Sequence, residues 1–128
     1  MEHDTMRAPL SRATGLGSAH NGVKHWWVQR VSAIALVPLM LWFIAAIIAH
    51  TGDDYTTFVA WMRNPITDIL MILLLFALFY HTALGLQVVV EDYVHSSAKF
   101  SVIIAMRLAC FALTVVGIVA TLHFAVAL

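Results

Sequence analysis

The sequence predicts an all-α protein with three transmembrane helices, and three observations support this fold class. Of the 128 residues, 62% are hydrophobic and only 11% are charged, whereas an ordinary soluble domain is about 25% charged. Three separate stretches each contain the roughly 20 apolar residues that a helix needs to cross a bilayer. The seven Lys and Arg residues balance the seven Asp and Glu residues, so the formal net charge is zero. This balance disfavours a soluble enzyme and also a nucleic-acid-binding protein, which would need a basic excess.

The chain is predicted to be a single membrane-anchor domain over residues 1–128, beginning with a flexible tail over residues 1–20. This tail is polar and rich in Ser, Ala, Gly and Thr, and such segments rarely form packed structure. It is not expected to be a secretory signal, because no apolar region follows Met1 at the usual distance. The first span is predicted at about residues 31–49. Pro38 lies inside it, and membrane helices tolerate such prolines.

The second span is predicted at about residues 69–90 and the third at about residues 102–126. Thr67 or Asp68 is expected to cap the second helix. Cys110 is the one cysteine in the sequence, which excludes an internal disulfide. Three helices bury little internal volume, so we expect them to pack with helices of a partner subunit.

The distribution of basic residues predicts the orientation of the chain, because cytoplasmic loops of membrane proteins carry an excess of Lys and Arg. Arg63 is the one basic residue expected between the first two spans. The others fall on the side of the N-terminus: Arg7, Arg12, Lys24, Arg30, Lys99 and Arg107. We therefore expect the N-terminus on the cytoplasmic side of the membrane and the C-terminus on the opposite side.

His81 is the most informative polar residue, since it is predicted about nine residues inside the second span. At 1.5 Å per residue, this position is about 14 Å from the membrane boundary. Gly85 follows one turn later on the same helix face. This pair suits a flat haem macrocycle, because the imidazole can ligate the iron while the glycine lets the ring approach the backbone. The alternative is a histidine that bonds to a neighbouring helix, and the spacing alone favours neither.

Four polar residues are predicted at one membrane boundary: Arg30, Asp92, Tyr93 and Arg107. A tyrosine hydroxyl at this level can donate to a quinone carbonyl, and Asp92 can orient that tyrosine or a nearby arginine. Arginines here can bind carboxylates such as haem propionates in a bidentate manner. The simpler alternatives are an interfacial aromatic, a solvated acid and arginines that reach lipid phosphates. On the residues alone the simpler alternative is favoured for Tyr93 and Arg107, and it stands level for Arg30. His123, near the end of the third span, is assigned no role.

Two segments resemble a known family. From His81 the sequence reads HTALGLQVVVEDYVH, and residues 21–36 read NGVKHWWVQRVSAIAL. Together with the three spans, they are similar to the small, D-type hydrophobic membrane-anchor subunit of succinate dehydrogenase (respiratory complex II). The resemblance extends from about Gly17 to the C-terminus. It implies a membrane anchor in a four-subunit complex with a cytochrome b556 anchor subunit, an iron–sulfur subunit and a flavoprotein subunit. Such a complex passes electrons from succinate to ubiquinone.

The resemblance also implies roles for particular residues. His81 corresponds to the axial ligand of haem b, whose second axial histidine comes from the partner anchor subunit. Tyr93 corresponds to the tyrosine that binds ubiquinone, and Asp92 to its neighbour, which supports the quinone site. Arg30 corresponds to an arginine near the haem propionates, and His25 is a further candidate for contact with them.

Two other functions stay open at this point. One is the anchor of a fumarate reductase, which would share this architecture. The other is a purely structural three-helix membrane subunit without haem. This chain alone is not expected to have dehydrogenase activity. We expect it in a bacterial inner membrane rather than a mitochondrial one, because no presequence is recognised.

Overall fold

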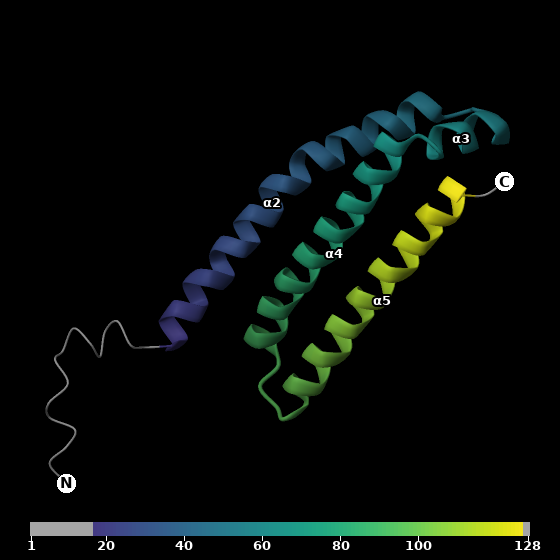
Figure 1. Cartoon of the computed structure of the whole chain (residues 1–128). Coiled ribbons are helices and arrows are strands. Elements are labelled where there is room, and N and C mark those ends of the chain that lie inside the picture. Colours follow the sequence, from purple (N-terminus) through teal and green to yellow (C-terminus); the bar gives the residue numbers. More distant parts are fainter. Residues whose placement is uncertain (1–16, 127–128) are drawn as a thin grey trace, which may run out of the picture.

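The computed structural model describes the backbone of residues 17–126 and the side chains of residues 22–126, and it contains four helices there (Figure 1). These are α2 (Gly17–His50), α3 (Tyr55–Met62), α4 (Pro65–Tyr93) and α5 (Ala98–Val126). Three segments are long and apolar enough to cross a membrane, namely Gly22–His50, Pro65–Tyr93 and Ala98–Val126. The all-α fold with three spans is therefore confirmed for the described residues.

All three long helices extend beyond the predicted spans. Helix α2 begins at Gly17, so residues 17–20 of the predicted tail are helical, and the rest of that tail lies outside the described residues. Each candidate span is 29 residues long, which corresponds to about 43 Å of helix against about 30 Å for the hydrocarbon core. Hydropathy detects only the part of a helix inside the core. It therefore missed the polar ends, such as the turn around Lys24.

The short helix α3 was not predicted, because its eight residues are too few for a hydropathy window. A local signal nevertheless specifies it. Asp54 is its N-cap, with a carboxylate that accepts a hydrogen bond of 3.0 Å from the Thr57 backbone N–H and one of 2.6 Å from the Thr56 hydroxyl. Gly52 has a φ of +93°, which a residue with a side chain rarely adopts, and it turns the chain from α2 towards α3.

The predicted cap of the second span was wrong. Asn64, not Thr67 or Asp68, is the N-cap of α4, and its side-chain oxygen accepts a hydrogen bond of 2.9 Å from the Ile66 backbone N–H. Pro65 occupies the first helical turn, where its missing N–H has no helical partner to lose. The Asn-Pro pair that resembles a turn is therefore the start of the helix itself.

Helix α4 is the central element, because it packs against both α2 and α5 (Figure 1). The contact between α4 and α5 is close at Gly117, where an added Cβ would lie 3.0 Å from a methyl carbon of Leu75. Helix α2 curves along its length in Figure 1, and Pro38 lies inside it, where it removes a backbone hydrogen bond.

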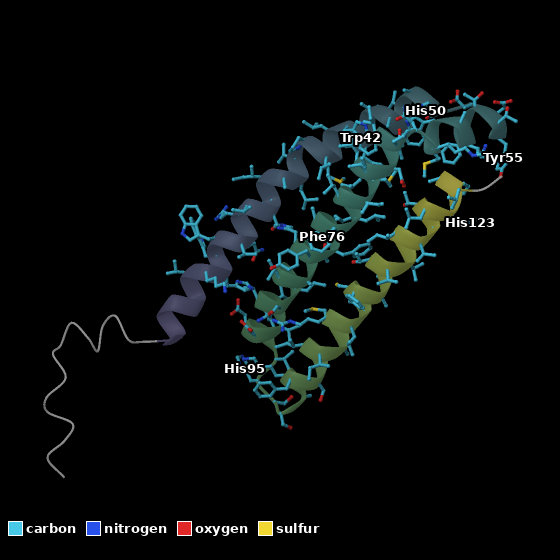
Figure 2. All side chains as sticks on the ribbon, in the orientation of Figure 1. Trp42, His50, Tyr55, Phe76, His95 and His123 are labelled. Carbon is cyan, nitrogen blue, oxygen red and sulfur yellow. The ribbon has the colours of Figure 1, made fainter. Side chains whose placement is uncertain are left out.

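The described residues bury very little of their own apolar surface. Only a few apolar side chains are buried: Leu36, Met62, Leu74 and Cys110. Large apolar side chains project outward along every span (Figure 2). A soluble protein could not expose such a surface. The surface suits contact with lipid or with the helices of another subunit.

Candidate functional site

The predicted site residues gather at one end of the helix bundle. At this end lie the N-terminal part of α2, the C-terminal part of α4 and the start of α5, while α3 and the end of α5 lie at the other (Figure 1). We call the first the N-terminal end. The sequence places Arg30, Asp92, Tyr93 and Arg107 at one boundary, and the order of the helices in the structure agrees with this.

A groove of about 680 Å³ opens between α2 and α4 at the N-terminal end. We call it the His81 groove. Its lining residues are Gly22, His25, Trp26, Gln29, Arg30, Ala33, His81, Gly85 and Val88. Three residues singled out from the sequence as haem contacts, His25, Arg30 and His81, therefore share one cavity with Gly85.

His81 is joined to α2 by a partly buried hydrogen bond. Its Nδ1 atom lies 2.9 Å from the Ser32 hydroxyl oxygen, and that hydroxyl donates a hydrogen bond of 2.8 Å to the Gln29 carbonyl. Ser32 is only 8% exposed. Sequence reasoning missed Ser32 and Gln29, because nothing in the spacing of α4 indicates which residues of α2 face His81.

Gly85 lines the groove without a side chain that would fill it. A Cβ placed on Gly85 would face the groove side of α2, 3.5 Å from the side-chain nitrogen of Gln29. A larger side chain at this position would project into the space between the two helices. The glycine one turn after His81 therefore keeps the cavity open beside the imidazole, as the spacing indicates.

His25 and Arg30 supply polar groups at the outer part of the groove. The Nε2 atom of His25 is buried and has no hydrogen-bond partner among the described residues. Buried polar atoms of this kind are rare in folded proteins and call for a partner. The guanidinium of Arg30 lies 5.3 Å from the centre of the Trp26 ring, within the range of a cation–π contact.

Asp92 and Tyr93 are not part of the His81 groove. They form the last turn of α4, and Tyr93 is 80% exposed. The described residues therefore bring His25, Arg30 and His81 together at one groove, and they leave Tyr93 largely exposed.

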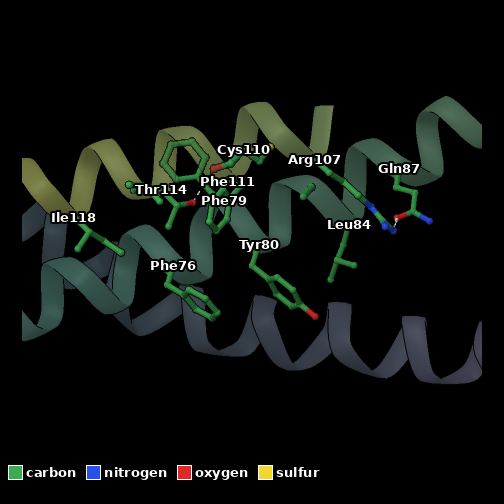
Figure 3. A pocket seen from close by; sticks show the side chains of 12 residues that line it. Phe76, Phe79, Tyr80, Leu84, Gln87, Arg107, Cys110, Phe111, Thr114 and Ile118 are labelled. Atoms are coloured by element: carbon green, nitrogen blue, oxygen red, sulfur yellow. Dashed lines mark hydrogen bonds between the residues drawn. The ribbon is translucent and has the colours of Figure 1, made fainter. Parts of the chain in front are cut away.

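Arg107 lies at one end of a second groove, of about 500 Å³, between α4 and α5 (Figure 3). Its guanidinium donates to the Gln87 side chain, and Gln87 in turn donates a hydrogen bond of 2.7 Å to Glu91. The remaining lining is largely aromatic and aliphatic, including Phe76 and Phe111 (Figure 3). Arg107 thus links α4 to α5 and does not reach the His81 groove.

The opposite end of the bundle holds a polar cluster of a different kind. Nδ1 of His50 lies 2.6 Å from a carboxylate oxygen of Asp53, within hydrogen-bond distance, and the His50 ring packs on Trp61 with 4.4 Å between ring centres. His123 lies at this end, on α5 next to Phe124. Within residues 22–126, whose side chains the structure describes, no three His, Cys, Asp or Glu side chains are grouped as a metal site.

Comparison with known proteins identifies the family of the chain. Residues 4–127 match the family described as succinate dehydrogenase/fumarate reductase transmembrane subunit. A succinate dehydrogenase hydrophobic membrane anchor subunit of Rickettsia bellii is 34% identical over 118 residues, which are 91% of this chain and 94% of that protein. The subunit of the same name from Paracoccus denitrificans is 29% identical over 96 residues, 75% of this chain and 74% of that one. The chain therefore belongs to the family of succinate dehydrogenase membrane anchor subunits.

Proposed function

We propose that this chain anchors a succinate:ubiquinone oxidoreductase, co-ligates haem b through His81 and contributes Tyr93 and Asp92 to a quinone site. Its partners would be a cytochrome b556 anchor subunit, an iron–sulfur subunit and a flavoprotein subunit. The membrane would be a bacterial inner membrane, with the N-terminal end of the bundle on the cytoplasmic side. The relatives from Rickettsia and Paracoccus support the bacterial assignment.

The observation that supports this proposal best is the composition of the His81 groove. A haem needs an imidazole for its iron, a flat surface for its ring and donors for its two propionate carboxylates. The groove offers His81, Gly85, and the pair Arg30 and His25 for these three needs. The buried Nε2 atom of His25, unpartnered among the described residues, is the kind of group that a carboxylate would satisfy. The residues present therefore fit the group.

The residues of this chain would bind and orient rather than react. His81 would hold the iron from one side, and Arg30 and His25 would hold the propionates by charge-assisted hydrogen bonds. Haem b held by these residues would supply electron transfer. Tyr93 would donate its hydroxyl proton in a hydrogen bond to a quinone carbonyl, with Asp92 beside it to orient the donor.

Replacement of His81 tests the ligand assignment. In the complex assembled from a His81→Ala chain and its partner subunits, we expect the reduced-haem absorption bands to be lost or shifted. The matched control is His123→Ala, which removes a histidine from the far end of α5 and should leave the bands unchanged. An unaltered haem spectrum in the assembled His81→Ala complex would contradict the proposal.

Replacement of the tyrosine tests the quinone site separately. A Tyr93→Phe chain keeps the ring and removes only the hydroxyl, so haem content should stay normal. Quinone reduction should show a raised KM for quinone, a lowered kcat or both, since a hydrogen bond to the substrate is lost. The control is Tyr80→Phe, a tyrosine of the same helix that lines the second groove, between α4 and α5. Normal values of both constants in Tyr93→Phe would remove this residue from the site.

A further inference from the structure

Ser32 has no part in the proposed function, yet it is the residue that bonds to the His81 ring. It is 8% exposed, in the wall that α2 presents to α4, and its oxygen lies 2.9 Å from Nδ1 of His81. The same hydroxyl is 2.8 Å from the Gln29 carbonyl, one turn earlier in α2. A buried hydroxyl between two polar partners constrains where the protons lie.

The number of protons decides the direction of the bond. A serine hydroxyl has one hydrogen, and the Gln29 carbonyl, 2.8 Å away, can only accept it, whereas Nδ1 of His81 can accept or donate according to its tautomer. When the hydroxyl donates to the carbonyl, the Ser32 oxygen offers lone pairs to the imidazole, and Nδ1 of His81 supplies the hydrogen of the bond between them. A neutral imidazole carries one N–H, so its Nε2 atom is left with a lone pair.

We propose that Ser32 is a positioning residue that holds His81 in the Nδ1–H tautomer, with Nε2 as the electron-pair donor. The bond joins two helices, so it also fixes the rotation of the ring relative to α2. Residues of α2 and α4 together line the His81 groove. By fixing the orientation of the His81 ring, Ser32 therefore also fixes the direction in which Nε2 points. The other tautomer would place a hydrogen on Nε2 and leave the Ser32 oxygen without its donor.

The consequence for haem rests on the proposed function. A histidine that ligates a metal usually donates its other ring N–H to a protein acceptor, and this bond fixes the tautomer and makes the ligand more basic. Ser32 supplies that acceptor here. Loss of such partners typically weakens metal affinity about 10–100-fold. A less basic ligand stabilises ferric iron less, so the midpoint potential of the haem should rise.

The first test needs no haem. The full chain, with ¹⁵N-labelled histidine, is placed in lipid nanodiscs without cofactor, and the His81 signals are assigned by their absence in His81→Asn. Protonated and unprotonated ring nitrogens give well separated ¹⁵N signals. At alkaline pH we expect the wild-type chain and Ser32→Thr to show Nδ1–H, and Ser32→Ala to shift towards Nε2–H. Thr121→Val is the control, because Thr121 is 4% exposed and its hydroxyl bonds only its own helix, at Gly117.

The second test uses the assembled complex. Ser32→Ala should release haem at least about 10-fold more readily than wild type, with a raised midpoint potential, and Ser32→Thr should restore both values. A wild-type tautomer in the haem-free Ser32→Ala chain would overturn the inference while leaving the His81 ligand assignment intact. Unchanged haem bands in His81→Ala would instead overturn the proposed function, and the tautomer measured without haem would still stand.

Discussion

At the scale of single residues, the His81 groove is distinguished by the polar side chains of His25, Arg30 and His81. Arg30 and His25 precede Ser32 by two and seven residues in the N-terminal half of α2. Among the described residues, Nε2 of His25 has no hydrogen-bond partner, and the Arg30 guanidinium contacts the Trp26 ring. Both groups are therefore available to bind a ligand. These two side chains are the groups that the proposed function assigns to the haem propionates.

Removal of the charge at Arg30 should weaken the binding of those propionates. In the assembled complex, Arg30→Gln should lose haem faster on dilution in detergent than wild type. A hydrogen bond to a charged group contributes about 1.5–3 kcal/mol, which corresponds to roughly a 10- to 150-fold change in affinity. The control is Lys24→Gln, an exposed cation of the same region that does not line the groove. Equal haem retention in the two variants would exclude Arg30 from the propionate contact.

The sequence was sufficient to find the residues of the groove that lie on one helix. The four-residue spacing of His81 and Gly85 places both on one face, because a helix repeats every 3.6 residues. The hydrogen bond between Ser32 and His81 could not be predicted from the sequence, because it depends on how α2 is rotated against α4. Tyr93 was named from the family motif, and it is 80% exposed, so the described residues alone do not enclose it.

At the scale of helices, the spans follow from hydropathy and the short elements from capping. Helix α3 and the start of α4 each begin at an Asx residue whose side chain accepts from a backbone N–H two or three residues later. Those signals are present in the sequence at Asp54 and Asn64, but hydropathy does not register the eight residues of α3, and the cap of α4 was predicted three to four residues too late, at Thr67 or Asp68. Hydropathy also missed the polar ends of the long helices.

The cap of α3 should depend on pH. Hydrogen bonds from Thr56 and then Thr57 lower the pKa of Asp54 from 3.8 to about 2. A carboxyl with a depressed pKa stabilises the fold fully above its unfolded value, and the stabilisation is lost as pH falls through the folded value. Protection of the α3 amides in hydrogen exchange should therefore be constant above about pH 4 and fall towards pH 2. Asn at position 54 can cap the helix but does not titrate, so protection in Asp54→Asn should not fall between about pH 4 and pH 2. An equally steep fall in this variant would show that Asp54 is not the group that titrates.

The packing of α5 on α4 should be sensitive to size at Gly117. An added Cβ would lie 3.0 Å from Leu75, so Gly117→Leu forces the two helices apart, and overpacking of this kind costs about 1–3 kcal/mol. Unfolding in mixed micelles measures the loss of stability. The double variant Gly117→Leu with Leu75→Ala should recover part of it. Absence of any recovery would show that the strain arises elsewhere.

At the scale of the whole molecule, the charge distribution and the bundle together define two different ends. Lys24, Arg30, Lys99 and Arg107 lie at the N-terminal end, while Arg63 lies beside α3 at the other. The positive-inside rule then predicts that the N-terminal end faces the cytoplasm. The same end carries the His81 groove and Tyr93, so both parts of the proposed electron path would face one aqueous compartment.

This orientation can be checked by labelling cysteines from either side of the membrane. In a Cys110→Ala background, Ser97→Cys marks the loop between α4 and α5, and Tyr55→Cys marks α3; both positions are exposed. A maleimide that does not cross membranes should label Ser97→Cys only in inverted vesicles and Tyr55→Cys only in spheroplasts. The reverse pattern would place the N-terminus outside.

The two partners of Ser32 have a consequence for how the chain enters the membrane. Ribosomes deliver α2 first, and its main neighbour in this chain, α4, emerges later. An unpaired hydroxyl among lipid tails would be costly during that interval. The bond from Ser32 to its own Gln29 carbonyl removes this cost before α4 arrives. When α4 arrives, the Ser32 hydroxyl already donates its hydrogen to Gln29, so its oxygen can only accept from His81. The same bond therefore lowers the cost of inserting α2 and determines which nitrogen of His81 carries the proton.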